Sequence, residues 1–242
     1  MPLRQIFEGI YQIELAWGMA YLLIGGGRSA IIDTGLASDL PALRAAIAEA
    51  GVSGETVDAV YLTHGHCDHA GGAAWFAERG ARIYAHRLEA HFIQPPAFSY
   101  GPRGWGCLRR PLTALGFWIG ERRFPVRRCP VDVQLEEGVL IESPVGPLRV
   151  LHTPGHTLGH ISLYRESDRL LFSGDAVLSI IPIRRVEALS LPIKFLSEDW
   201  PEARRSARRL AELGPASLLP GHGYAITERT ELRLREWALR LN

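Results

Sequence analysis

The segment His64-Gly65-His66-Cys67-Asp68-His69 places four side chains that can bind a transition metal within six residues. Neutral imidazole suits zinc, iron and copper, and a carboxylate adds a harder oxygen ligand. A strand alone cannot direct all four to one point, because alternate side chains leave on opposite faces. The apolar run 57–63 comes directly before the segment, and Gly71-Gly72 follows it. The pattern therefore predicts a buried strand, a metal-binding loop, and then a helix that begins near Ala73.

Three shorter motifs occur further along the chain, each after a short apolar run and each with glycine or proline shaping the turn. They are Thr153-Pro154-Gly155-His156-Thr157, Phe172-Ser173-Gly174-Asp175 and Pro220-Gly221-His222-Gly223. Strand ends that meet at one edge of a sheet can form a site from residues far apart in sequence. With the first segment, these motifs supply five histidines and two aspartates, which is enough for two metal ions.

The four motifs, in this order, resemble those of the metallo-β-lactamase superfamily, specifically its dinuclear hydrolase branch. Asp33-Thr34-Gly35, after an apolar run, resembles a further early element of that family. The resemblance extends from about Ile10 to Tyr224 and so covers nearly the whole chain. It implies an α/β fold, the four-layer αββα sandwich of this family, and a metal-dependent hydrolase.

The resemblance also implies a role for each ligand in a site with two divalent metal ions, zinc first, with iron or manganese as alternatives. One ion would be held by His64, His66 and His156. The other would be held by Asp68, His69 and His222, with Asp175 bridging both ions. Asp33 and His160 would support these ligands without binding metal. No organic cofactor is expected.

The implied mechanism is the attack of a metal-bridging hydroxide on an ester-like substrate, since zinc lowers the pKa of bound water to about 7. The candidate catalytic residues are Asp68 and Asp175. Asp68 would orient the hydroxide and later give a proton to the leaving group. The substrate is expected to be small: a carboxylic ester, a lactone, a thioester or a phosphoester.

Comparison within the superfamily leaves several alternatives. True zinc β-lactamases generally lack an aspartate in the bridging role of Asp175, so low-level β-lactam hydrolysis is a lesser alternative. Glyoxalase II enzymes share the ligand set but add a C-terminal helical region, and only 20 residues follow His222. Leu178 stands where acyl-homoserine lactonases typically carry a tyrosine. Two further alternatives are a mononuclear iron dioxygenase of the persulfide type and a non-catalytic ligand-binding protein.

Composition limits the partners and the location. The chain has 242 residues, of which 47% are hydrophobic and 22% charged, as is typical of globular proteins. A net charge of +1 argues against a nucleic-acid partner. Three cysteines do not form a disulfide framework, and neither a signal peptide nor a membrane span is evident. A cytoplasmic location and a small-molecule substrate are expected, and the oligomeric state is left open.

Periodicity predicts the order of elements. Strands are expected within 10–33 and at 57–63, 82–85, 139–142, 147–152, 160–165, 169–173 and 217–219, with helices at 40–50, 73–78, 199–213 and 227–240. Because the ligands extend from His64 to His222, a single domain over residues 1–242 is predicted.

Residues 87–135 do not fit this order and are interpreted as an inserted cap. Residues 87–130 contain eight arginines and two glutamates, which gives this stretch a net charge of +6 in a chain whose total net charge is +1. A second irregular stretch, 178–196, is assigned to the same cap, because such insertions often carry specificity. The cap predicts a substrate with an apolar part and an anionic part, and a solvated basic surface is the alternative.

Overall fold

The computed structural model describes residues 3–93, 127–182 and 184–241. The chain divides into two compact units. The N-terminal unit comprises Met1–Leu135 and Ser143–Val145, and the C-terminal unit comprises Glu136–Glu142 and Gly146–Asn242. Each unit combines one large β-sheet with helices.

The N-terminal unit contains a seven-stranded sheet whose strands lie in sequence order. They are β1 (Leu3–Phe7), β2 (Ile10–Glu14), β3 (Met19–Gly25), β4 (Arg28–Ile32), β5 (Ala59–Tyr61), β6 (Arg82–His86) and β7 (Val133–Leu135). The strands β1 to β4 are antiparallel, whereas β4 to β7 pair in parallel. The parallel pairs require crossover connections, so the carboxyl ends of β4, β5 and β6 lie along one edge of the sheet.

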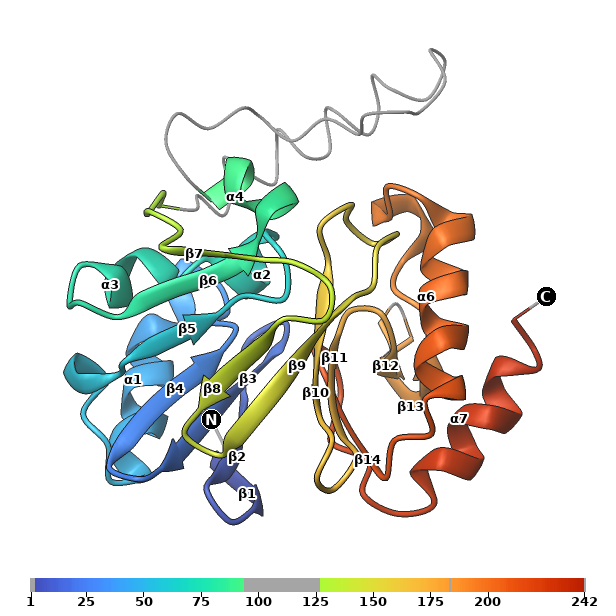
Figure 1. Ribbon diagram of the computed structural model, residues 1–242, viewed down its shortest axis with the longest axis horizontal. Coiled ribbons are helices and arrows are strands. Elements are labelled where there is room, and N and C mark those ends of the chain that lie inside the picture. Colours follow the sequence, from blue (N-terminus) through green and yellow to red (C-terminus); the bar gives the residue numbers. More distant parts are fainter. Residues whose placement is uncertain (1–2, 94–126, 183, 242) are drawn as a thin grey trace. The chain divides into compact units, whose positions relative to one another are not determined.

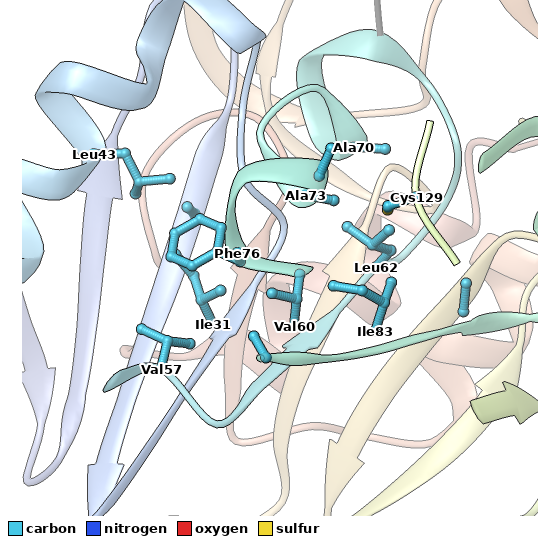
Figure 2. Close-up of a cluster of buried hydrophobic side chains, with 14 of the residues drawn as sticks. Ile31, Leu43, Val57, Val60, Leu62, Ala70, Ala73, Phe76, Ile83 and Cys129 are labelled. Atoms are coloured by element: carbon cyan, nitrogen blue, oxygen red, sulfur yellow. The ribbon is translucent and has the colours of Figure 1, made fainter. Parts of the chain in front are cut away.

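The helices of this unit occur in those crossovers. They are α1 (Leu40–Glu49), α2 (Cys67–Ala70), α3 (Ala73–Ala77) and α4 (Arg87–Ile93), with 3-10 turns η1 (Ala37–Asp39) and η2 (Gly54–Thr56). The pairing register places Leu22, Ile31, Val60 and Ile83 in one row across four strands. This row packs against Leu43 of α1 and Phe76 of α3, and Figure 2 shows the Phe76 ring among these side chains.

The C-terminal unit contains a five-stranded sheet in the order β14-β11-β10-β9-β8. The strands are β8 (Leu140–Ser143), β9 (Gly146–His152), β10 (Ile161–Arg165), β11 (Leu170–Gly174) and β14 (Ser217–Pro220). The strands β9, β10 and β11 are antiparallel, and β14 joins β11 in parallel. A separate hairpin pairs β12 (Leu178–Ile181) with β13 (Val186–Ser190), followed by the 3-10 turn η3 (Lys194–Leu196).

Two helices, α6 (Trp200–Glu212) and α7 (Thr230–Ala238), complete this unit and lie side by side in Figure 1. Asp199 caps the N-terminus of α6, and its Oδ1 accepts the Glu202 N–H at 2.9 Å. Its buried side includes Leu210, which packs with Leu218 of β14 and Leu234 of α7. An amphipathic sequence therefore places α6 over the strands that deliver the C-terminal motifs.

The α/β class predicted from the sequence is confirmed, and most predicted elements lie within two or three residues of their expected positions. The predicted strand 57–63 is shorter and ends at Tyr61, because the Thr63 N–H donates to the Asp33 side chain instead of to a neighbouring strand. The stretch 178–196 was expected to be irregular, and this was wrong, since it contains the β12–β13 hairpin.

The predicted cap, 87–135, lies for most of its length outside the described residues and stays a prediction there. Its two ends belong to the N-terminal unit. Ala90 and Ile93 of α4 and Cys129 and Val131 enter the hydrophobic core, and β7 is an edge strand of the sheet. In the described parts of the chain, no helix is long and apolar enough to cross a membrane.

Candidate metal centre

In the N-terminal unit, the predicted ligands lie after β5, beside Asp33 at the end of β4. Asp33 has a left-handed backbone with φ of 57°, which is costly for a residue other than glycine and persists only where other contacts fix it. Its Oδ1 accepts the Thr63 N–H at 2.9 Å, and its Oδ2 accepts the Thr63 hydroxyl at 2.8 Å. The same Oδ2 lies 2.8 Å from His69 Nδ1, and both side chains are buried.

This network assigns the protons of two histidines. His69 Nδ1 faces a carboxylate, so it donates and its Nε2 keeps the lone pair. The single Thr63 hydroxyl proton goes to Asp33, so Thr63 Oγ1 accepts from His64 Nδ1 at 3.1 Å. His64 Nε2 therefore also keeps its lone pair. One carboxylate thus prepares two imidazoles to bind a metal through Nε2.

The ligand atoms of the first segment converge within this unit. His64 Nε2 lies 3.0 Å from His66 Nδ1. Two nitrogens on one tetrahedral zinc, each about 2.05 Å from it, would lie roughly 3.3 Å apart. The ligand atoms of Asp68 and His69 lie within 4.8 Å of each other. The donor types and their spacing fit divalent metal binding.

The segment Asp33-Thr34-Gly35 holds α2, which contains Asp68 and His69. Thr34 donates to the His69 carbonyl from both its N–H, at 2.7 Å, and its hydroxyl, at 2.8 Å. A Cβ on Gly71 would lie 2.7 Å from the Gly35 carbonyl oxygen, closer than any side chain allows. Glycine at position 71 therefore permits direct backbone packing of α2 against this segment.

Asp39 lies in the same region. The pKa of its carboxyl is raised above the ordinary value, mainly by burial and to a smaller extent by the negative charge of Asp68. The Leu36 N–H, which donates to Asp39 Oδ2 at 3.0 Å, opposes this increase. Asp68 itself is half-buried, so its carboxylate remains accessible.

In the C-terminal unit, three strands deliver the other predicted ligands. His156 follows β9, Asp175 follows β11 and His222 follows β14. Asp175 Oδ2 lies 3.4 Å from His156 Nε2 and 3.3 Å from His222 Nε2. These separations are long for hydrogen bonds but match the roughly 3.3 Å expected between two ligands of one metal. The Asp175 carboxylate is therefore placed to bind a metal together with either imidazole.

A chain of buried hydrogen bonds holds Asp175. Its N–H donates to His160 Nε2 at 2.9 Å, and His160 Nδ1 lies 2.8 Å from Thr153 Oγ1. Thr153 Oγ1 lies 3.0 Å from Ser162 Oγ, which donates to the Ser173 carbonyl at 3.1 Å. A carbonyl only accepts, so every proton in the chain points toward Ser173. His160 Nε2 accepts the Asp175 N–H and His160 Nδ1 donates to Thr153, so neither ring nitrogen is available to a metal. His160 therefore supports Asp175.

His156 is positioned by the start of α6 and by η3. Its Nδ1 lies 3.5 Å from Ser197 Oγ, which donates to the Ile193 carbonyl at 3.1 Å. Gly155 has φ of +128°, and a Cβ there would lie 2.0 Å from the Ala203 nitrogen. Glycine at this position is therefore required for the turn that presents His156.

The structure describes all nine predicted site residues, and their ligand roles remain predictions. Within the N-terminal unit, it brings together His64, His66, Asp68, His69 and Asp33. Within the C-terminal unit, it brings together His156, His160, Asp175 and His222. Sequence reasoning missed Thr63, which links Asp33 to His64, and Glu89, whose side chain accepts the Gly65 N–H. Thr63 directly precedes the first segment, which was an available signal, whereas nothing in the sequence points to Glu89.

Comparison with known proteins agrees with these motifs. A family model described as the metallo-beta-lactamase superfamily matches residues 18–222. The probable metallo-hydrolase YybB of Bacillus subtilis is 28% identical over 96% of this chain and 96% of its own length. A hydroxyacylglutathione hydrolase of Cereibacter sphaeroides is 27% identical over 83% of this chain and 60% of its own length.

Two solved structures extend the comparison. The metallo-beta-lactamase family protein TTHA1429 of Thermus thermophilus has a TM-score of 0.73 at 28% identity, covering 97% of this chain and 80% of that protein. TTHA1623 in a di-iron-bound form has a TM-score of 0.63 at 26% identity, covering 92% and 96%. The match of the family model over most of the sequence shows that this chain belongs to the metallo-β-lactamase superfamily.

Proposed function

We propose that the chain is a metal-dependent hydrolase of small ester-like substrates, with a dinuclear metal centre. The observation that supports this most is the position of Asp175 Oδ2, 3.4 Å from His156 Nε2 and 3.3 Å from His222 Nε2. A carboxylate placed between two imidazoles suits a pair of cations. The names of the relatives, metallo-hydrolase and hydroxyacylglutathione hydrolase, support hydrolysis as the reaction class.

In this proposal, seven side chains hold two ions. His64, His66 and His156 hold one ion, and Asp68, His69 and His222 hold the other, with Asp175 shared. Imidazole and carboxylate ligands suit zinc. Iron, which the di-iron form of TTHA1623 contains, and manganese are the alternatives. Two divalent ions bound here would supply hydroxide at neutral pH and polarise a substrate oxygen.

The residues of the chain set up this chemistry. Asp33 and Thr63 fix the imidazoles of His69 and His64 with their Nε2 lone pairs available. Asp68, half-buried and one residue from His69, can hold a proton and give it to a leaving group. The backbone of Asp175 is fixed by His160, so its carboxylate needs little rearrangement during the reaction.

We propose a thioester, carboxylic ester, lactone or phosphoester with an apolar part and an anionic part as the substrate class. The local charge of +6 over residues 87–130 supports the anionic part, although most of that stretch lies outside the described residues. The sparse cysteines favour a cytoplasmic location, and the spread of the ligands along the sequence favours one functional domain.

The test is a panel of these substrate classes and a β-lactam, at two salt concentrations, with metal content measured on the same sample. We expect chelator-sensitive hydrolysis of at least one ester-like class and a KM that rises with salt, since exposed charges are screened within about 10 Å at 0.1 M. One iron per chain with oxygen consumption on a persulfide, and no hydrolysis, would show the dioxygenase alternative instead.

A further inference from the structure

A buried acidic side chain contacts the metal-binding loop from outside the sequence motifs. Glu89 lies in α4 and is 0% exposed. Its Oε2 accepts the N–H of Gly65 at 2.7 Å. Gly65 is the residue between His64 and His66, whose ligand nitrogens lie 3.0 Å apart. The contact therefore acts on the backbone that sets the separation of these two imidazoles.

The position of Glu89 is itself fixed by packing. The α4 helix follows β6 directly, and the Leu88 N–H donates to His86 Nδ1 at 3.2 Å. Ala90 and Ile93 of the same helix are buried in the core of the N-terminal unit. The hydrogen bond from Gly65 therefore links the metal-binding loop to a helix that is packed on the core.

Placing a carboxylate away from water is costly unless polar partners compensate for it. The separation of 2.7 Å between the Gly65 nitrogen and Glu89 Oε2 is at the short end of the range for this kind of hydrogen bond. The Gly65 N–H is one such partner, and the bond that it forms fixes the backbone between His64 and His66. This indicates a role in holding the loop.

We propose that Glu89 is a positioning residue of the metal centre, which holds Gly65 so that His64 and His66 keep the spacing needed to share one ion. The proposal rests on the proposed metal centre. It gives α4 a function in the metal centre, although α4 contains none of the ligand motifs. The hydrogen bond to Gly65, rather than the negative charge of Glu89, would hold the loop in place.

The test compares Glu89→Gln, which keeps an acceptor oxygen, with Glu89→Met, which keeps the length of the side chain without an acceptor. Two quantities are measured: hydrogen exchange of the Gly65 amide in the metal-free protein, and zinc affinity by competition with a chelator. We expect Glu89→Met to speed exchange at Gly65 and to weaken zinc binding about 10- to 100-fold, as other changes beside metal ligands do. Glu89→Gln should stay within about threefold of the unchanged protein in both.

Asp58→Ala is the matched control, because Asp58 Oδ2 also accepts a backbone N–H, that of Ser29 at 2.9 Å, at the opposite end of β5. It should leave exchange at Gly65 and zinc affinity unchanged. Unaltered exchange and affinity in Glu89→Met would overturn the proposal. So would equal losses in Glu89→Gln and Glu89→Met, since charge would then be the property that counts.

If Glu89→Met does not fold, Glu89→Asp takes its place, because the shorter side chain keeps the carboxyl group but withdraws it from the Gly65 N–H; it should show the same two losses, and their absence would overturn the proposal. Exchange at Gly65 is measured without metal or substrate, so the proposal can fail while the hydrolase function stands. Conversely, faster exchange and weaker zinc binding in a protein without hydrolytic activity would uphold the role of Glu89 and count against the proposed function.

Discussion

At the scale of single residues, one buried carboxylate organises the N-terminal half of the candidate site. Asp33 receives Thr63 through two hydrogen bonds and His69 through a third. The motif around Asp33 could be recognised from the sequence. The link through Thr63 could not be recognised from the sequence. The Thr63 hydroxyl reaches Asp33 only because the backbone at Asp33 is left-handed, and no residue type at that position requires this conformation.

Thr63→Val keeps the branched shape of the side chain but removes the acceptor for His64 Nδ1. We expect His64 to lose its preference for the Nδ1-protonated tautomer and zinc affinity to fall about tenfold. Thr63→Ser keeps the hydroxyl and should behave like the unchanged protein. Nitrogen NMR of the imidazoles and chelator competition measure the two effects. If His64 has the same tautomer and the protein the same zinc affinity in the Thr63→Val and Thr63→Ser variants, the contact between Thr63 and His64 has no effect on metal binding.

Cys129 provides a prediction based on burial. Its thiol lies in the hydrophobic core, where burial, followed by the charges of Asp132 and Glu78, raises its pKa to about 11. A pKa above the ordinary value stabilises the folded state below about pH 9, and this contribution is lost as the pH rises toward 11.

We therefore expect folded Cys129 to resist alkylation at pH 8, because the thiolate is the reactive form. Mass spectrometry after treatment with iodoacetamide checks this site by site. Half-buried Cys67 serves as the comparison and should react first. Rapid modification of Cys129 in the folded protein at pH 8 would contradict the assignment.

At the scale of elements, periodicity predicted most strands and helices, and the departures have local causes. The Asp33 side chain takes the Thr63 N–H, so β5 ends two residues before the predicted end of the strand. The β12–β13 hairpin was missed because its residues, 178–190, mix apolar runs with proline and arginines and show no alternation. Tertiary contacts, rather than propensity, decide both segments.

Phe76 tests the packing of α3 on the N-terminal sheet. It is fully buried beside the row that contains Ile31 and Val60. Phe76→Ala should lower the free energy of unfolding by about 3–5 kcal/mol through lost burial and the cavity left behind. Leu239→Ala, at a side chain 78% exposed, should change it by no more than about 0.5 kcal/mol. Denaturant unfolding of both variants provides the comparison, and equal values would refute this view of the core.

At the scale of the whole molecule, the candidate ligands divide between the two compact units. The N-terminal unit contains four of them in one segment, and the C-terminal unit contains three at the ends of three strands. The sequence predicts both sets as ligands, because they follow apolar runs, and this role stays a prediction. It could not predict the supports around them, such as Glu89 and Ser197, which depend on how helices and turns pack.

If the predicted ligands bind two ions, metal binding should stabilise the folded state. Ligand at 100 times its dissociation constant adds about 2.7 kcal/mol to the free energy of unfolding. We expect a chelator to lower Tm measurably, and zinc to restore it. Calorimetry with and without the chelator tests this, and a Tm insensitive to metal would argue against metal binding by these residues.

The central claim is tested most directly by counting metal ions per chain in the unchanged protein and in Asp175→Ala, with ester hydrolysis and circular dichroism on the same samples. We predict two divalent ions per unchanged chain. In Asp175→Ala, we predict at most one ion and loss of most activity with the fold retained, because two cations would lack their shared anion. Two ions and undiminished turnover in Asp175→Ala, or a single ion in the unchanged protein, would contradict the dinuclear assignment.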